Sequence, residues 1–322
     1  MLKINVCEDI EEARCLWQLH WPQESLFDLW PVRECFQKQF RHHPFFLVAY
    51  ENNRFCGMLT LSWINEECCF GHFPGELWQG RTWLERNRIV AENSKVTSAL
   101  LCHIPGPAVI RYIENTNPLG DDSITGVDEI GYLFVPGDYN YSFQAYLQSF
   151  SGKARQNFRR EMKRLEAGGL YYRLDCYDDL EHMFRLNLEN FKDSSYFNDS
   201  RFLKSFENLA AWLHSRGLLR ITTVVIEGGV AAVDMGAIWN GTYTLLAGGT
   251  NGNYPGVAKL INFFHMQRAC QERLAEVDFL CGDFNWKNRF HLTPRPLYKV
   301  CNQRASFNAL DLPIRQSIAY AG

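Results

Sequence analysis

The sequence predicts an α/β (α+β) protein of two tandem, similar halves, each a mixed, mostly antiparallel sheet flanked by helices. Its 322 residues exceed the size at which one hydrophobic core usually stops growing, so two domains are expected. Both halves also show the same order of elements: a strand, helices, a three-strand meander, a helix and a further strand. We therefore expect an N-terminal domain at residues 1–142, an inter-domain helix at 143–167 and a C-terminal domain at 168–322.

Composition excludes several classes of protein. Hydrophobic residues make up 46% of the chain and aromatic residues 14%, which excludes a disordered or fibrous protein. The net charge of −3 gives no overall bias towards nucleic acid or anionic membranes. The chain has neither a signal-peptide pattern nor an apolar run near the ~20 residues of a membrane span. The 11 cysteines include no C-x-x-C pair. We expect a cytoplasmic protein with reduced thiols and no metal.

The clearest local pattern is a meander in the C-terminal half. Asn240-Gly241 is a strong type I′ hairpin signal, because both central positions of that turn need positive φ. Residues 248–256 are rich in glycine and are expected to form a loop. The expected strands are residues 171–175, 219–226, 230–239, 242–247 and 277–280, and the expected helices are 178–191, 201–214 and 257–274.

The N-terminal half shows the same order less sharply. It has no convincing glycine-rich loop after its meander, so we expect it to support the structure and bind substrate. Helical segments are expected at residues 9–40, with breaks near Pro22 and Pro31, and at 82–103. The expected strands are residues 3–6, 46–50, 55–64, 68–73, 108–113 and 129–135.

The glycine-rich loop and the helix after it form a candidate phosphate site. A helix N-terminus offers unpaired backbone N–H groups and a positive dipole end, which suits a pyrophosphate. An ordinary connection between a strand and a helix is the alternative. The candidate cofactor-binding residues are Gly249, Thr250, Asn251, Gly252, Gly256, Val257 and Ala258.

Two further features carry charge. Asp234 interrupts an apolar strand, where a carboxylate is costly unless it is paired or faces a cleft. His265 lies inside the following helix, and a hydrogen-bonded structural histidine is the favoured interpretation. The helix at 143–167 carries a basic run that includes Arg159. This run is either a solvated helix face or a contact for an anionic substrate.

The segment after the long helix carries a family resemblance. It resembles the CelD-like branch of the GNAT acyltransferases, in which Pro-Gly opens a helix that leads into Asp-Phe-Leu-x-Gly-Asp-x-x-Tyr-Lys. The tandem arrangement is also similar to Fem-type aminoacyl ligases. Trp286 replaces the tyrosine of the motif, and the matching residues are Pro255, Gly256, Asp278, Phe279, Leu280, Gly282, Asp283 and Lys287.

The resemblance implies that two strands part beside the helix and admit an acyl-thioester between them. Coenzyme A pyrophosphate would bind the backbone of residues 251–258, and N–H groups near 248–250 would polarise the thioester carbonyl. Asp283 is the first choice of base, with a salt bridge to Lys287 or Arg289 as its structural alternative. Asp234 and Tyr298, the latter as proton donor to the leaving thiolate, are further catalytic candidates. Lys287, Trp286 and Arg159 are the candidate substrate-binding residues.

Three functions follow from these features. The first is transfer of an acyl group, above all acetyl, from acyl-CoA to an amine or hydroxyl of a small-molecule or envelope-precursor acceptor. The second is a Fem-like ligase that uses aminoacyl-tRNA. The third is a GNAT-like binding protein without catalysis, which the exchange of tyrosine for Trp286 and the lack of an obvious glutamate base leave open.

Overall fold

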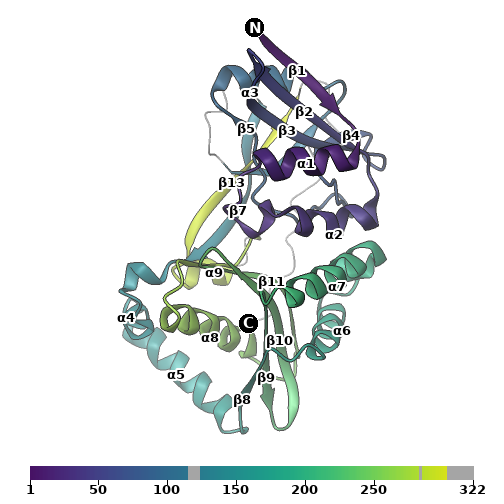
Figure 1. The fold of residues 1–322 in the computed structure, drawn as a ribbon. Helices are drawn as coiled ribbons and strands as arrows, with labels where there is room; N and C mark the ends of the chain where they lie inside the picture. The colour runs from purple at the N-terminus through teal and green to yellow at the C-terminus, as the bar shows by residue number, and fades with distance from the viewer. Residues whose placement is uncertain (115–123, 283–284, 303–322) are drawn as a thin grey trace. The chain divides into compact units, whose positions relative to one another are not determined.

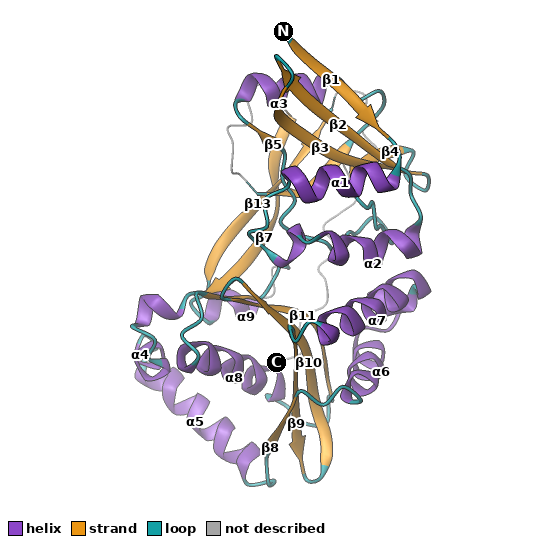
Figure 2. Ribbon diagram, in the orientation of Figure 1, coloured by secondary structure: helices purple, strands orange, loops and turns teal. Residues whose placement is uncertain are grey.

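The computed structural model describes residues 1–114, 124–282 and 285–302, without the side chains of residues 124, 125, 285 and 286 (Figure 1). The chain divides into two compact units. Among the described residues, unit 1 contains Met1–Ile130, Lys204–Leu209 and residues 296–302. Unit 2 contains Gly131–Leu203 and Ala210–Arg295. Helices and sheets alternate along the chain, which confirms the predicted mixed α/β class (Figure 2).

Unit 1 is built on an antiparallel sheet with strand order β1-β2-β3-β4, to which β5 adds beside β3. A second set of strands pairs β6 antiparallel with β13 (Thr293–Cys301). The other elements of this unit are β1 (Leu2–Cys7), α1 (Ile10–His20), α2 (Trp30–Phe40), β2 (Pro44–Glu51), β3 (Arg54–Ile64), β4 (Cys69–His72), β5 (Val90–Ala91), α3 (Ser94–Cys102) and β6 (Val109–Ile113).

An aromatic cluster holds α1 and α2 of unit 1 to the sheet. Trp17 is fully buried and stacks on Trp21 with ring centroids 4.1 Å apart. Trp30 stacks on Phe73 at 5.1 Å. Asp9 starts α1, because its carboxylate accepts hydrogen bonds from the N–H groups at the first turn. The N-terminal tryptophans therefore serve packing.

The chain between β4 and α3 is not the helix that the sequence predicted. Only Ser94–Cys102 is helical, and it begins at the N-cap Asn93. The buried carboxylate of Glu76 accepts hydrogen bonds from the N–H groups of residues 83 and 84. Asn87 forms a parallel bridge with Ile113 of β6. Backbone groups that a helix would pair internally are thus taken by distant partners, which overrides the helical pattern.

Arg88, in the segment between β4 and α3, belongs to a buried cluster of charged side chains. The Arg88 guanidinium contacts the carboxylates of Asp28 and Glu114, at 3.1 and 3.0 Å. Arg33 donates to the carbonyl of Phe73 at 3.0 Å. Burial, together with the nearby Arg33 charge, lowers the pKa of His72 to about 3. This histidine is therefore neutral in the folded protein at ordinary pH.

Unit 2 has the strand order β7-β12-β11-β10-β9-β8, in which β11 and β12 are parallel and the other pairs are antiparallel. Its elements are β7 (Ile124–Phe134, whose first residues belong to unit 1), α4 (Phe143–Gln148), α5 (Gly152–Glu166), β8 (Tyr171–Leu174), α6 (Asp179–Phe191), α7 (Ser200–Ser215, partly in unit 1), β9 (Leu219–Ile226), β10 (Gly229–Trp239), β11 (Thr242–Thr250), α8 (Val257–Gln271), β12 (Glu276–Asp278) and α9 (Asn285–Arg289).

The meander of unit 2 confirms its prediction, apart from small differences in where its strands begin and end. Asn240 and Gly241 both have positive φ, 46° and 76°, as the hairpin signal requires. Strand β11 runs to Thr250, three residues beyond its predicted end, so the glycine-rich loop begins only after it.

The predicted single helix at 143–167 is two helices, because Ser151 caps a new helix after the end of α4.

Candidate functional site

The sheet of unit 2 opens between two neighbouring strands. The parallel pairing of β11 with β12 ends at Thr244 and Asp278. Beyond this point β11 continues along β10 as far as Thr250. The chain after β12 follows β7 instead, because Phe279 and Leu280 exchange backbone hydrogen bonds with Tyr132 at 2.9 and 3.3 Å. The two strands therefore part, as the family resemblance implied.

A β-bulge lies in β11 just beyond the last pair with β12. Met235 and Gly236 are adjacent in β10, but their partners in β11 are Ala247 and Leu245. Leu246 is thus the extra residue. A bulge disrupts the regular ladder and re-aims the backbone groups beside it. The regular ladder between β10 and β11 is therefore interrupted at Leu246, next to the gap.

Helix α6 fixes the end of β11 through two asparagines. The side-chain amide of Asn187 donates to the carbonyl of Gly248 at 2.6 Å, and Asn190 donates to the carbonyl of Thr250. A Cβ at Gly249 would lie 2.5 Å from the Met183 carbonyl oxygen, so only glycine fits against the backbone of α6. Gly249 and Thr250, predicted as loop residues for the cofactor, are instead strand residues packed against α6.

The loop between β11 and α8 is shaped by its own backbone. The N–H of Asn251 bonds to the carbonyl of Ala231 at 2.8 Å, and its side chain accepts the N–H of Asn253 at 3.0 Å. Gly256 has a φ of 92° and directly precedes α8. Val257 N–H bonds to the Tyr254 carbonyl. The N–H groups of residues 258 and 259 lie in the first turn, which has no intrahelical acceptor for them.

The basic helix α5 lies beside this loop. Arg164 donates to the carbonyl of Pro255, and Glu161 forms an ion pair with Lys259 of α8. A Cβ added at Gly256 would meet only the Arg164 guanidinium, at 3.7 Å. One at Gly252 would meet nothing within 4 Å. The loop is therefore open to a ligand and has a cation at its border.

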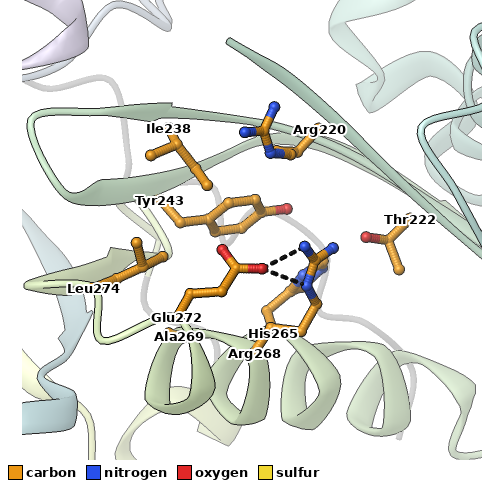
Figure 3. A pocket seen from close by; sticks show the side chains of 9 residues that line it. All are labelled: Arg220, Thr222, Ile238, Tyr243, His265, Arg268, Ala269, Glu272 and Leu274. Carbon is orange, nitrogen blue, oxygen red and sulfur yellow. Dashed lines mark hydrogen bonds and ion pairs between the residues drawn. The ribbon is translucent and has the colours of Figure 1, made fainter. Parts of the chain in front are cut away.

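Asp234 is buried and paired on the helix side of the sheet. It is 1% exposed, and its Oδ2 lies 2.9 Å from Nε2 of His265 in α8. The His265 ring stacks on Tyr243 at 4.9 Å, next to a cavity of ≈ 20 Å³ with room for about one water (Figure 3). Burial, reinforced by the Asp234 charge, raises the pKa of Tyr243 well above its usual value. Oδ2 of Asp234 is thus paired, whereas Oδ1 is buried without a hydrogen-bond partner among the described residues.

The Asp-Phe-Leu motif forms a rigid corner after β12. Asp278 is fully buried and accepts the N–H of Leu280 at 2.9 Å. The same carboxylate binds the guanidinium of Arg295 at 2.9 Å. Leu280 has a φ of 57°, a left-handed conformation that is uncommon for a non-glycine residue. The motif aspartate therefore holds the turn that leads towards residue 283.

Lys287 requires a correction. Its ammonium is 2% exposed and donates to the carbonyls of Phe279, Leu280 and Cys281 at 3.0, 2.8 and 2.9 Å. An ammonium has three N–H donors, and all three are used here. The sequence suggested that Lys287 binds substrate, but in the structure its ammonium is engaged in holding the turn after β12.

The other predicted residues lie in several places. Asp283 and the side chain of Trp286 are outside the described part of the structure. Tyr298 belongs to unit 1, where it pairs with Ile113 and packs against an apolar cluster. Arg159 is exposed on α5.

The described residues form neither a metal site nor a membrane span. No group of three or more His, Cys, Asp or Glu side chains there is arranged to hold a metal ion. No helix in that part of the chain is long and apolar enough to cross a membrane. The 11 cysteines are all free thiols.

Sequence reasoning missed the bulge at Leu246, the asparagines of α6 and the partner of Asp234. Asn187 and Asn190 are three residues apart and so share a helix face, which was a usable signal. His265 was recognised as a structural histidine, but nothing local paired it with a residue 31 positions earlier.

Comparison with known proteins agrees with this geometry. Residues 152–288 match the family model described as an acetyltransferase (GNAT) domain, which confirms the expected resemblance to GNAT acyltransferases over that range. The search of curated proteins found no match.

The fold is similar to that of several solved structures. A conserved protein of unknown function from Bacteroides thetaiotaomicron VPI-5482 has a TM-score of 0.60 at 13% identity, over 93% of this chain and 99% of that one. FemX has a TM-score of 0.57 at 10% sequence identity, over 94% of this chain and 99% of the FemX chain. L-PGS from Bacillus licheniformis has a TM-score of 0.57 at 10% sequence identity, over 94% of this chain and 95% of the L-PGS chain. At these identities the likeness concerns the fold alone.

Proposed function

Taking residues 152–288 as a GNAT acetyltransferase domain, we propose that this protein transfers an acyl group, in the simplest case acetyl, from acyl-CoA to an amine or hydroxyl. The observation that carries the proposal is the parting of β11 from β12 beyond Thr244 and Asp278, with the bulge at Leu246 immediately after it. A strand edge of this kind offers preorganised N–H donors to an acyl carbonyl and to the oxyanion that forms from it.

The loop after β11 supplies the second half of the donor site. The backbone of residues 251–258 would bind the pyrophosphate of coenzyme A at the start of α8, where N–H groups and the helix dipole favour an anion. Gly252 and Gly256 leave space for close approach, and Arg164 adds a positive charge at the border. The donor groups, the space and the charge all suit a phosphorylated ligand.

The reaction needs little from the side chains. The acceptor nitrogen or oxygen forms a bond to the acyl carbon, the C–S bond breaks, and the electron pair leaves with sulfur. Backbone N–H groups of β11 would hold the carbonyl oxygen while it carries negative charge. Asp283 is our candidate for the base that takes the acceptor's proton, and the departing thiolate takes up a proton as it leaves. A small-molecule or envelope-precursor acceptor remains our prediction.

Calorimetric titration with acetyl-CoA, coenzyme A and bulk tRNA tests the proposal. We expect both coenzyme A species to bind, and Gly256→Trp to weaken that binding at least ~100-fold, about 2.8 kcal/mol, because the indole fills the entrance of α8. Gly217→Trp is the matched control, since Gly217 also has positive φ and open space around it.

The other two functions give distinct results. Binding of tRNA in place of coenzyme A would favour an aminoacyl-tRNA ligase. Binding of neither donor would overturn both enzyme functions and leave a binding protein. Coenzyme A binding that survives Gly256→Trp undiminished would show that the loop is not the donor site.

A further inference from the structure

A large groove lies between α5 and α8 of unit 2. Its volume is ≈ 560 Å³, within the range of small-molecule sites. The two helices lie side by side (Figure 1), and Phe158 of α5 packs edge-on against Phe263 of α8 with centroids 5.2 Å apart. The groove extends over about 16 Å of each helix, at a rise of ~1.5 Å per residue. None of the donor-loop residues 250–258 lines it. It is therefore separate from the proposed donor site.

The floor of the groove is apolar. Leu260 and Phe263 are buried, whereas Met162 and Phe264 are only half buried although both are large and hydrophobic. Tyr172 of β8 stacks on Phe264 with centroids 4.0 Å apart and closes one side. Apolar surface that gathers in one hollow, rather than scattering over the molecule, marks a place where a hydrophobic ligand gains free energy by leaving water.

The rim of the groove is positively charged. Arg155, Arg159, Lys163 and Arg268 line it, against the single carboxylate of Glu166. Arg155 donates to backbone carbonyls, and Arg268 forms an ion pair with Glu272. Arg159 and Lys163 lie one helical turn apart on α5, and their side chains make no hydrogen bond or ion pair with the rest of the described chain. Two cations are thus available at the edge of an apolar hollow.

We propose that this groove binds a single-chain, long-chain carboxylate of the fatty-acid class. The hydrocarbon chain lies on the aromatic floor between α5 and α8. The carboxylate binds Arg159 and Lys163, which offer charge-assisted hydrogen bonds without giving up an existing partner. The proposal rests on the shape and charge of the groove and stands independently of acyl transfer.

Titration of the full-length protein with dodecanoate, below its micelle concentration, tests this site. We expect binding of one dodecanoate per chain, with butanoate at least tenfold weaker because its chain covers little of the floor. Arg159→Glu and Lys163→Glu should each weaken dodecanoate binding at least tenfold. Arg160→Glu is the matched control and should leave it unchanged, since Arg160 is exposed on the same helix but does not line the groove.

Other outcomes would overturn the proposal. Absence of dodecanoate binding would do so directly. Equal weakening by Arg160→Glu would show attraction to the basic helix as a whole. Equal binding of dodecyl maltoside, which has the same chain and a neutral head, would remove the role of the two cations.

Two further variants separate this site from the donor site. Gln267→Trp places an indole in the groove from an exposed position and should abolish dodecanoate binding while coenzyme A still binds. Gly256→Trp should do the reverse. Loss of both ligands in both variants would mean that the groove is part of the donor site, and the proposal would fail.

Discussion

Units 1 and 2 contain a similar arrangement of strands but differ in the path of the chain that follows it. In each, three consecutive antiparallel strands end beside a parallel neighbour: β4 meets β6 through Phe70 and Ala108, and β11 meets β12 through Thr244 and Asp278. In unit 2 the partner strands then part, and a short loop leads into α8. In unit 1 the chain after β4 returns to the same neighbour.

The segment around Asn87, between β4 and β5, pairs with β6 in unit 1. One edge of β6 is taken by β13, through the pair of Ile113 with Tyr298. Asn87 also pairs with Ile113, with its backbone bonded to Tyr112 and Glu114 at 2.9 and 2.7 Å. The position beside β6 that corresponds to the gap between β11 and β12 is therefore occupied, in unit 1, by the chain around Asn87. Of the two units, only unit 2 has the gap in which we propose that the donor binds.

The largest expected effect concerns whether the chemistry belongs to unit 2. Asp283→Asn removes the carboxylate that we propose as the base, and we expect kcat to fall ~10²–10⁴-fold. Coenzyme A affinity should stay within about twofold, because the loop at 251–258 is untouched. Release of free coenzyme A thiol over a panel of primary amines measures the rate. Asp193→Asn, at an exposed site, is the control. Parallel loss of rate and affinity would make Asp283 structural.

The next prediction separates the units by their response to acid. The folded pKa of His72 is about 3, below its ordinary 6.5, so the unfolded state binds more protons between these values. The stability of unit 1 should therefore fall as pH drops below about 6.5, by about 1.4 kcal/mol per pH unit, or about 2 kcal/mol at pH ~5.

Urea unfolding followed by tryptophan fluorescence checks this, since Trp17 and Trp21 lie in the core of unit 1. His72→Gln should flatten the pH dependence. His43→Gln, at an exposed histidine, should preserve it. An unchanged slope in His72→Gln would assign the acid sensitivity to other groups.

The smallest expected effect compares two glycines in equivalent strands. A Cβ at Gly249 of β11 meets a backbone oxygen of α6 at 2.5 Å, whereas one at Gly71 of β4 meets the Cδ1 methyl of Ile64 at 2.5 Å. A side-chain tip can rotate away and a helix backbone cannot. Gly249→Ala should thus cost about 2 kcal/mol of unfolding free energy and Gly71→Ala less than about 1. Equal costs in urea unfolding would contradict this difference.

The parts of the fold that follow local rules were predictable. Asn240-Gly241 fixed the hairpin because the turn itself needs those residues, and strand β9 has its predicted bounds. The end of β11 was not predictable. Gly248 and Gly249 suggest a loop locally, and only the close approach of α6 explains why glycine stands in a strand.

The site divides in the same way. The motif at 278–287 predicted the position of the corner after β12, but it did not predict which of its side chains hold the turn. Whether Lys287 binds substrate or carbonyl oxygens depends on a fold that brings residues 279–281 around its ammonium. The parting of β11 and β12 depends on β7, which precedes them by more than a hundred residues.

The pairing of β6 with β13 has a consequence for the order in which the protein is made. Asn302 follows β13. Its side-chain oxygen accepts a hydrogen bond from the N–H of Ala108, and its side-chain amide donates one to the carbonyl of Gly106. The first unit to leave the ribosome therefore awaits residues almost two hundred positions later to complete the pairing of β6. Unit 2, made in between, has all its strands sooner. We expect the nascent chain to hold a folded unit 2 before unit 1 is finished, so that the half made first is the half completed last.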